Sequence, residues 1–485
     1  MVRTSRKILL PRLTLTKVVT AEDPGAIRVA LPDGAPSPAY FVQPIHSEID
    51  SERRDRLPLW MGTRFNLFPL VLDANGAPWA EAVIYVLSRL QGTVAPSMDT
   101  YSSIASDLSA FRRFIDEYPE IDWTHFPAYK LNRPTYRYNA HLRRSIAAGD
   151  IAPTTAKRRM SNVIAFYRWL QADGLLVPAH EPWKSSDRYI ELKNSLGFKF
   201  TKQVTTTDVS IRTPKQADPY AGTIDDGGKL RPLTEEEQGW LLEALLAKGN
   251  TEMTLIHLFG LLTGARIQTI LTFQVQHVTP DFVACLDGEV RIPVGPGTGI
   301  DSKNDKQLVL HIPAWFYQKL HTYAGSDRAR RRRLRAKGGD SANQYLFLSV
   351  RGAPLYLNNL EKADFDEENS RRHQKAGQGV RQFITDRIIP YIRENHEPQF
   401  WYRFHDTRAS FGMNLTDHQL KLVTSGEVTL HQAREFVKNR MGHESAATTD
   451  SYLQYRSNLK FVRQTEREYE NHLRTLTDGV LEGKA

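Results

Sequence analysis

Two stretches in the N-terminal half repeat their apolar residues at three- and four-residue steps, which restricts both stretches to amphipathic α-helices. One begins after Pro153-Thr154-Thr155, where a threonine can cap the helix, and it ends at Asp173-Gly174. The other ends before Pro119, and its apolar positions are Tyr101, Ile104, Leu108, Phe111 and Ile115. Residues 76–178 are therefore expected to form a helical domain.

Residues 231–456 are expected to form a second, mixed domain. Thr234 and Glu237 have the spacing of a capping box, which predicts that a helix begins there. Alternating apolar runs farther along predict three strands, at residues 282–286, 290–294 and 308–312. The fold class that follows is mainly α with a small antiparallel β-sheet.

Three further segments complete the chain. Residues 1–75 mix short apolar runs with Pro, Gly and charge, so an extended or short-stranded arm is expected. Residues 179–230 are rich in Lys, Thr, Asp, Pro and Gly with little periodicity, which is typical of an interdomain linker. Residues 457–485 repeat apolar side chains at near-helical spacing, which predicts a C-terminal tail helix.

Composition favours an anionic partner and a reducing compartment. The 485 residues carry a formal net charge of +9, and the sequence pI is near 9.3. The single cysteine, Cys285, excludes an internal disulfide framework and any multi-cysteine zinc site. The basic start is followed by too short an apolar run for a secretory signal, and no run is long enough to span a membrane. A soluble, cytoplasmic protein is expected.

Four short motifs follow one another in the second domain. They are an arginine after a Thr-Gly pair (Arg266), a His-x-x-Arg (His405 and Arg408), a Gly-His (His443) and a tyrosine nine positions later (Tyr452). Each motif is common by itself, so their information lies in the order. Together they supply a nucleophile, cations for phosphate oxygens and proton-transfer groups, which phosphoryl transfer without a metal requires.

In this order the residues resemble the catalytic signature of the tyrosine recombinases, also called the phage integrase family. The resemblance implies that Tyr452 attacks a DNA phosphate and leaves a 3′-phosphotyrosyl link, while His405 assists its proton transfer. Arg266 and Arg408 are implied to hold the non-bridging oxygens, because a guanidinium donates two parallel hydrogen bonds. His443 is implied to add a further hydrogen bond to the phosphate.

Two of these assignments have an alternative. Similar recombinases carry a mobile lysine on a hairpin, which is implied to protonate the leaving 5′-oxygen; Lys303 matches it, with Lys306 as the alternative. Tyr455 is the alternative nucleophile, but the Gly-His spacing favours Tyr452. The family commonly has an acidic residue three positions after its first arginine, where this chain has Thr269.

The resemblance covers roughly residues 79–470 and extends to architecture and partners. It implies a helical core-binding domain and a mixed α/β tyrosine-recombinase catalytic domain that clamp double-stranded DNA, with no cofactor or metal. It also implies a homotetramer on paired sites, an accessory DNA-bending protein as a further candidate partner, and a location at the nucleoid. The C-terminal helix is expected either to pack on its own domain or to dock on a neighbouring protomer, as C-terminal helices do in similar recombinases. The residues expected to meet phosphates are Lys157, Arg158, Arg159 and Arg168.

The implied function is site-specific recombination that integrates or excises a mobile element. A topoisomerase IB-like or hairpin-forming enzyme shares the chemistry and stays open, as does a catalytically silent DNA-binding protein. Two basic runs, residues 328–337 and 371–375, are expected to be solvated or to contact phosphate. Ser425-Gly426-Glu427 predicts an inserted turn between Arg408 and His443.

Overall fold

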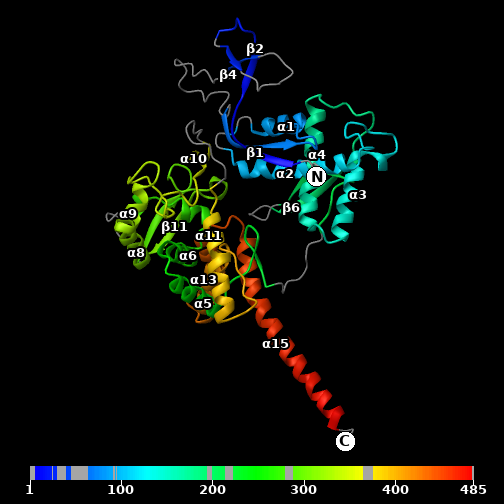
Figure 1. Cartoon of the computed structure of the whole chain (residues 1–485). Helices are drawn as coiled ribbons and strands as arrows, with labels where there is room; N and C mark the ends of the chain where they lie inside the picture. Colours follow the sequence, from blue (N-terminus) through cyan, green and yellow to red (C-terminus); the bar gives the residue numbers. More distant parts are fainter. Residues whose placement is uncertain are drawn as a thin grey trace. The chain divides into compact units, whose positions relative to one another are not determined.

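The computed structural model divides the chain into two compact units, each with its own core (Figure 1). Unit 1 comprises Met1–Lys215 and Asn359–Gln374, and unit 2 comprises Gln216–Asn358 and Lys375–Ala485. The structure describes residues 6–24, 26–29, 40–44, 64–90, 93, 96–193, 199–213, 222–278, 288–363 and 375–482.

Unit 1 combines short antiparallel strands with a small helical bundle. Strand β1 pairs with β5, β4 lies between β2 and β3, and β6 pairs with β7. The strands are β1 (Arg6–Thr14), β2 (Thr16–Val19), β3 (Ile27–Val29), β4 (Tyr40–Pro44), β5 (Arg64–Leu72), β6 (Ser185–Lys193) and β7 (Lys199–Thr207). The helices are α1 (Ala80–Leu90), α2 (Met98–Glu117), η1 (Lys130–Asn132), α3 (Pro134–Ala147), α4 (Pro153–Ala172) and α10 (Asn359–Ala363).

An aromatic core holds the bundle of unit 1 together. The apolar stripe predicted for α2 is confirmed, because Leu108 and Phe111 are fully buried and the helix ends before Pro119. The Trp79 ring packs edge-on against Phe166 of α4, with 5.2 Å between the ring centroids. The Tyr167 hydroxyl donates to the carbonyl of Trp123, so the polar end of a buried ring is satisfied.

Two expectations for unit 1 need correction. The N-cap of α4 is Ala152 and the first helical residue is Pro153, so the predicted threonine cap is wrong. Proline takes this place because its fixed φ suits a helix and its missing N–H is not needed there. The expected linker is also more ordered than its composition indicates, since residues 185–207 contain the hairpin β6–β7. The run of β-branched residues at the end of β7 favours that structure.

Unit 2 consists of helices around one two-stranded sheet, with a smaller hairpin at its start. Its strands are β8 (Ile224–Asp225), β9 (Lys229–Leu230), β10 (Glu289–Val294) and β11 (Leu308–Pro313). Its first helices are α5 (Glu235–Lys248), α6 (Thr251–Thr263), α7 (Ile267–Leu271), η2 (Val275–Val278), η3 (Lys303–Asp305), α8 (Ala314–Gly325) and α9 (Asp327–Leu334). The later ones are α11 (Gln378–Phe383), η4 (Ile384–Ile388), α12 (Ile389–Asn395), α13 (Asp406–Thr424), α14 (Leu430–Met441) and α15 (Ala446–Glu482).

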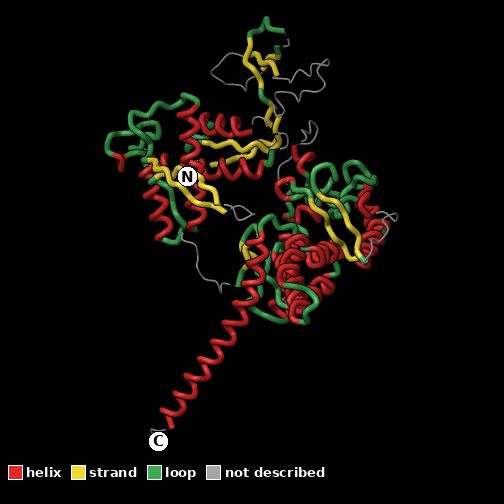
Figure 2. The backbone as a smooth tube through the Cα atoms, turned by 180° about the vertical axis from the view of Figure 1, so that it is seen from behind, coloured by secondary structure: helices red, strands yellow, loops and turns green. Residues whose placement is uncertain are grey.

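The predicted local structure of unit 2 is largely confirmed. Thr234 and Glu237 form the capping box at the start of α5. The β10–β11 hairpin lies where two strands were predicted, and it packs on α6 and α8 (Figure 2). The third predicted strand, 282–286, lies outside the described residues, as does Cys285. Residues 425–427 form the predicted turn between α13 and α14. The fold is mainly α with small antiparallel sheets.

Part of the basic run at 328–337 forms an internal ion-pair network that was not expected, while Arg331, Arg335 and Lys337 are exposed, as a solvated run requires. Arg328 and Arg332 bind the two oxygens of the buried Glu252, at 2.7 and 2.8 Å. Arg333 is itself buried and binds Asp340 at 2.5 Å. Arg328 and Arg332 therefore tie α9 to α6, because a buried carboxylate must be paired. Of the second run, only Lys375 lies within the described residues, and it is exposed.

His257 at the centre of unit 2 should make stability sensitive to acid. Its Nδ1–H donates to the carbonyl of Met253 at 2.7 Å, so its Nε2 accepts from the Tyr402 hydroxyl at 3.0 Å. Burial lowers the pKa of His257 to about 4. The ordinary histidine pKa is about 6.5. Between about pH 6.5 and about pH 4 the unfolded chain therefore binds more protons at this histidine than the folded chain does. The free energy of unfolding thus falls as the pH falls, by about 1.4 kcal/mol per pH unit.

Chemical unfolding of wild type and His257→Gln at pH 7 and pH 5 measures this effect. The variant is expected to be less stable at both values, but the gap between the two proteins should shrink at pH 5. A gap that is independent of pH would show that the histidine does not titrate in this range.

Helix α15 runs without interruption from Ala446 to Glu482 and extends away from the other helices of unit 2 (Figure 1). Its 37 residues include Tyr452 and residues 457–482 of the predicted tail, so the expected boundary at 456/457 falls inside one helix. Tyr469 and Leu473 are exposed near its far end. None of the described helices is both long and apolar enough to cross a membrane.

Candidate active site

Unit 2 brings the predicted arginines, His443 and Tyr452 to one place. Arg266 is the residue that precedes α7, and it follows a turn in which Gly264 has a φ of 66°. His443 follows Gly442, which ends α14 with a φ of 62°. Both turns need the left-handed conformation that glycine adopts without strain. Arg408 comes from α13 and Tyr452 from the second turn of α15.

Arg408 is buried and fully engaged. Its Nη1 donates to the carbonyl of Gly264 at 2.8 Å and its Nη2 to the carbonyl of Met441 at 2.7 Å. These bonds fix the guanidinium between the two turns that carry Arg266 and His443. Its Nε faces the centre of the site, while the bonds given for both Nη atoms go to main-chain carbonyls, so the expected pair of parallel hydrogen bonds from Arg408 to one anion is not formed in this arrangement.

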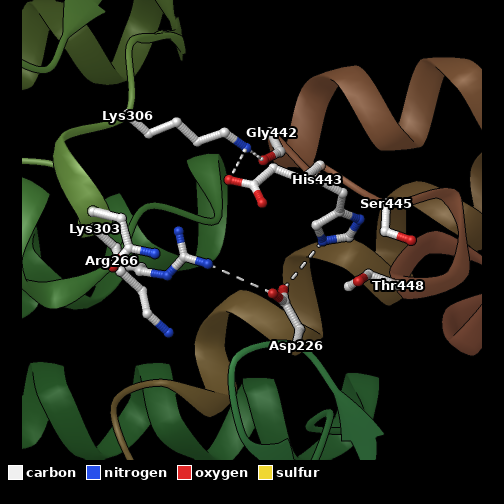
Figure 3. Close-up of a pocket in the computed structure, with 10 residues that line it drawn as sticks. Asp226, Arg266, Lys303, Lys306, Gly442, His443, Ser445 and Thr448 are labelled. Atoms are coloured by element: carbon white, nitrogen blue, oxygen red, sulfur yellow. Dashed lines mark hydrogen bonds and ion pairs between the residues drawn. The ribbon is translucent and has the colours of Figure 1, made fainter. Parts of the chain in front are cut away.

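The centre of the site is a carboxylate that the sequence reasoning missed, Asp226. Its Oδ2 accepts hydrogen bonds from Arg408 Nε at 2.7 Å, from the Tyr452 hydroxyl at 3.1 Å and from His443 Nε2 at 3.2 Å. Its Oδ1 lies 3.6 Å from Arg266 Nη2. Figure 3 shows Arg266 and His443 directed at Asp226. One anionic group thus meets four of the predicted site residues.

Asp226 lies in the turn between β8 and β9, inside the stretch that was expected to be a linker. The Asp-Gly-Gly sequence of residues 226–228 is a turn signal, and the apolar residues Ile224 and Leu230 flank it. That pattern indicates a hairpin, but it carries no sign that the hairpin reaches a cluster of arginines.

The electrostatics of the cluster keep Asp226 charged and Tyr452 protonated. Burial alone would raise the pKa of the Asp226 carboxyl, but the hydrogen bond from His443 and the charge of Arg408 hold this pKa well below its usual range. Burial, followed by the negative charge of Asp226, raises the pKa of the Tyr452 hydroxyl far above its usual value. In this arrangement the tyrosine is a hydrogen-bond donor and a poor nucleophile.

His405 lies at the start of α13 beside the same cluster. Burial and the charges of Arg408 and Arg266 lower its pKa to about 4, although a hydrogen bond to the main chain of Asp226 opposes the shift. The ring is therefore neutral at physiological pH. A neutral imidazole can accept a proton, which is what the expected role of His405 requires.

The two candidate lysines occupy different positions in the turn between β10 and β11. Lys306 Nζ donates to the carbonyl of Gly442 at 2.8 Å and lies 3.4 Å from Glu444. Within the described part of the chain, the Lys303 ammonium makes no hydrogen bond or ion pair, and it borders the cavity in front of Asp226 (Figure 3). The position of Lys303 thus favours it as the mobile cation, while Lys306 holds the Gly-His turn.

The Tyr452 ring is packed tightly, with its hydroxyl turned to the cluster. It lies in an apolar group with Ile224, Met413 and Met441, at whose margin Tyr455 packs. Gly412 of α13 passes so close that a Cβ there would lie 2.9 Å from Tyr452 Cζ and 3.0 Å from Met441 Cε. A side chain at this position would therefore displace the ring.

The cavity in front of Asp226 is polar and has a volume of about 210 Å³. Arg266 Nε at this site is buried and has no hydrogen-bond partner among the described residues. Thr269, where the family commonly has an acidic residue, donates instead to the carbonyl of Asp301 at 2.9 Å. No three His, Cys, Asp or Glu side chains in the described ranges are grouped as metal ligands.

The four basic residues predicted to meet DNA lie on α4 in unit 1. Lys157, Arg158 and Arg168 are exposed, and Arg159 is half-buried. Arg158 binds the buried Asp107 at 3.0 Å, and the Arg168 guanidinium lies 5.7 Å from the centroid of the Trp183 ring. Lys157 and Arg168 therefore present their charge to solvent, whereas Arg158 also has a structural partner.

No protein-family model matches the sequence, and no curated protein matches it. Among solved structures the chain is similar to XerH site-specific recombinase bound to palindromic difH substrate, with 13% identity, a TM-score of 0.45, and coverage of 80% of this chain and 88% of that chain. A lambda integrase dimer bound to a COC′ core site gives 14% identity, a TM-score of 0.42 and coverages of 77% and 94%. Tn1549 transposon integrase in complex with transposon right end DNA gives 14% identity and a TM-score of 0.43. The match covers 79% of this chain and 98% of that chain.

Proposed function

We propose that this chain is a tyrosine recombinase that cleaves and rejoins double-stranded DNA through a 3′-phosphotyrosyl intermediate. The observation that carries the proposal is the convergence of Arg266, Arg408, His443 and the Tyr452 hydroxyl on one anionic group, at distances between 2.7 and 3.6 Å. Cations that surround a tyrosine hydroxyl at an anion position are the arrangement expected for phosphoryl transfer to tyrosine.

In the proposed reaction the Tyr452 oxygen attacks the scissile phosphorus and loses its proton to His405. The bond from phosphorus to the 5′-oxygen breaks, and Lys303 gives a proton to that oxygen. Arg266, Arg408 Nε and His443 hold the non-bridging oxygens, where charge develops. The phosphotyrosyl bond conserves the energy of the broken bond, so attack by a 5′-hydroxyl reverses the sequence and rejoins the strand.

The biological role proposed is site-specific recombination that integrates or excises a mobile element, with a homotetramer joining two sites. Lys157 and Arg168 are proposed to contact phosphates, because exposed cations on one helix suit a sequence-independent contact with the backbone. Tyr469 and Leu473, exposed four residues apart on α15, are proposed to dock on a neighbouring protomer.

Covalent trapping tests the function. Wild-type protein is incubated with a random-sequence duplex library that carries a nick near each potential cleavage position, so that the short 5′-hydroxyl product diffuses away. After denaturation, the DNA that stays attached is sequenced and the attached peptide is identified by mass spectrometry. Adducts at Tyr452 that share one sequence are expected.

Other outcomes decide between the alternatives. Adducts spread over all sequences would favour a topoisomerase-like enzyme, because such an enzyme needs no defined site. Salt-sensitive DNA binding with no adduct would favour a catalytically silent binder.

Gly412→Ala should weaken adduct formation without abolishing DNA binding, because the added methyl group displaces the Tyr452 ring. A displacement of about 1 Å at a reacting group costs roughly 100-fold in rate. Gly239→Ala is the matched control, since a Cβ at Gly239 on α5 meets nothing within 4 Å. The rate of adduct formation on a nicked duplex measures the difference. Equal rates for the two variants would contradict the assigned position of the tyrosine.

A further inference from the structure

The carboxylate at the centre of the site belongs to the chain itself, and this has a consequence for how DNA enters. We propose that Asp226 occupies the position of the scissile phosphate, and that the tip of the β8–β9 turn must withdraw before a phosphate can bind. The inference rests on the proposed function, because it takes this cluster to be the phosphate site. It makes the described arrangement an autoinhibited one.

The donors around Asp226 are those assigned to the phosphate. Arg408 Nε, His443 Nε2 and the Tyr452 hydroxyl all donate to Asp226 Oδ2. These atoms cannot bind Asp226 and a phosphate oxygen in the same place at the same time. A carboxylate also fills the site incompletely, because Arg266 lies 3.6 Å from Oδ1 and its buried Nε has no partner among the described residues. A phosphate, with more oxygens, can satisfy more of these donors.

The same contact suppresses the nucleophile. The Tyr452 hydroxyl donates its proton to Asp226, so its lone pairs are turned away from the position of a phosphorus atom. A negative charge at 3.1 Å also opposes formation of the phenolate. Withdrawal of Asp226 thus frees the anion position and eases the loss of the tyrosine proton in one movement.

The turn is anchored at its ends by apolar side chains, and its tip is held by the hydrogen bond from the Asp226 N–H to the Gly228 carbonyl and by Arg403 at the Lys229 carbonyl. Ile224 is fully buried in the apolar group with Tyr452, and Leu230 is also buried. Between them, Gly227 has a φ of 71°, and a Cβ there would be 3.0 Å from Lys303 Nζ. Two glycines after Asp226 allow the tip to adopt another conformation while the anchors stay in place. The movement required is therefore local to residues 225–229.

A rival explanation keeps Asp226 in place during the reaction. The carboxylate would then orient Arg266 and Arg408. It would replace the acidic residue that the family commonly has at the position of Thr269. The two explanations predict opposite effects of Asp226→Asn on activity. They are also separated by anion binding, because a carboxylate that supports the arginines does not compete with an anion.

The experiment compares full-length wild type, Asp226→Asn and Asp225→Asn. Asp225 is exposed and lies in the same hairpin, so its substitution makes the same change in net charge beside the site. Calorimetry without DNA measures the affinity for inorganic phosphate, and a nicked duplex measures the rate of adduct formation. If the asparagine variant does not fold, Asp226→Ser replaces it, because a hydroxyl can still accept from Arg408.

Asp226→Asn is expected to bind phosphate at least tenfold more tightly than wild type and to form adducts faster, while Asp225→Asn resembles wild type in both assays. Unchanged phosphate affinity in Asp226→Asn, or slower adduct formation by a folded Asp226→Asn, would overturn the proposal. Tighter phosphate binding with no adduct from any variant would support an occluded anion site and reject the recombinase function.

Discussion

Tyr452→Phe is expected to form no covalent adduct with DNA and to bind duplex DNA with unchanged affinity. The variant lacks only the hydroxyl oxygen, which is the attacking atom of the proposed reaction. Phenylalanine fills the same buried space beside Met413 and Met441, so the packing of α15 on α13 is retained. A denaturing gel of protein incubated with a labelled, nicked duplex measures the adduct, and salt-dependent binding to the same duplex measures the affinity.

The chain offers a matched control for this loss. Tyr455→Phe removes the same atom from the same helix, three residues beyond, where the ring packs at the margin of the apolar group. This control should retain adduct formation. Adducts that persist in Tyr452→Phe and disappear in Tyr455→Phe would move the nucleophile to Tyr455.

Arg408→Ala is expected to cost structure as well as chemistry. The side chain binds the carbonyls of Gly264 and Met441 and the carboxylate of Asp226. Its removal leaves a buried carboxylate short of its closest cation and two carbonyls without this donor, and breaking such a buried pair costs about 3–5 kcal/mol of unfolding free energy. Adduct formation should also be lost, because the turns that carry Arg266 and His443 are no longer joined.

Chemical unfolding followed by circular dichroism measures the stability loss. Arg403→Ala is the control, since Arg403 is exposed and its Nη2 donates to the carbonyl of Lys229; it should lose less than about 1 kcal/mol. A loss in Arg408→Ala as small as that in Arg403→Ala would show that the guanidinium serves the phosphate alone. From the sequence alone, Arg408 was expected only to bind the phosphate. Its buried contacts with the carbonyls of Gly264 and Met441 add the expected loss of stability.

Local patterns predicted the helices and one hairpin because these depend on short-range spacing. The stripe on α2 and the capping box at Thr234 follow from helical geometry within a few residues. The β10–β11 hairpin follows from alternation. His405, Arg408 and Tyr452 were predicted as site residues from their order in the chain, and the structure places them in one cluster.

Contacts between distant residues could not be read in the same way. Asp226 and Tyr452 are 226 positions apart, and nothing near either residue signals the other. The pairing of Arg328 and Arg332 with Glu252 is similar, because a run of arginines has the same sequence whether it faces water or a buried carboxylate. The hairpin β6–β7 was missed because its strands are rich in Ser, Thr, Asp and Lys, a composition close to that of a linker.

The unbroken helix α15 gives the protein a mechanical lever. Tyr452 lies in its second turn, and 30 further residues extend the same rod by about 45 Å. A stiff rod transmits a push or a twist from one end to the other, whereas a loop after the nucleophile would absorb it. In the proposed reaction, a partner that grips the far end of α15 would therefore shift Tyr452 directly, and the timing of strand cutting would be set by a contact far from the DNA.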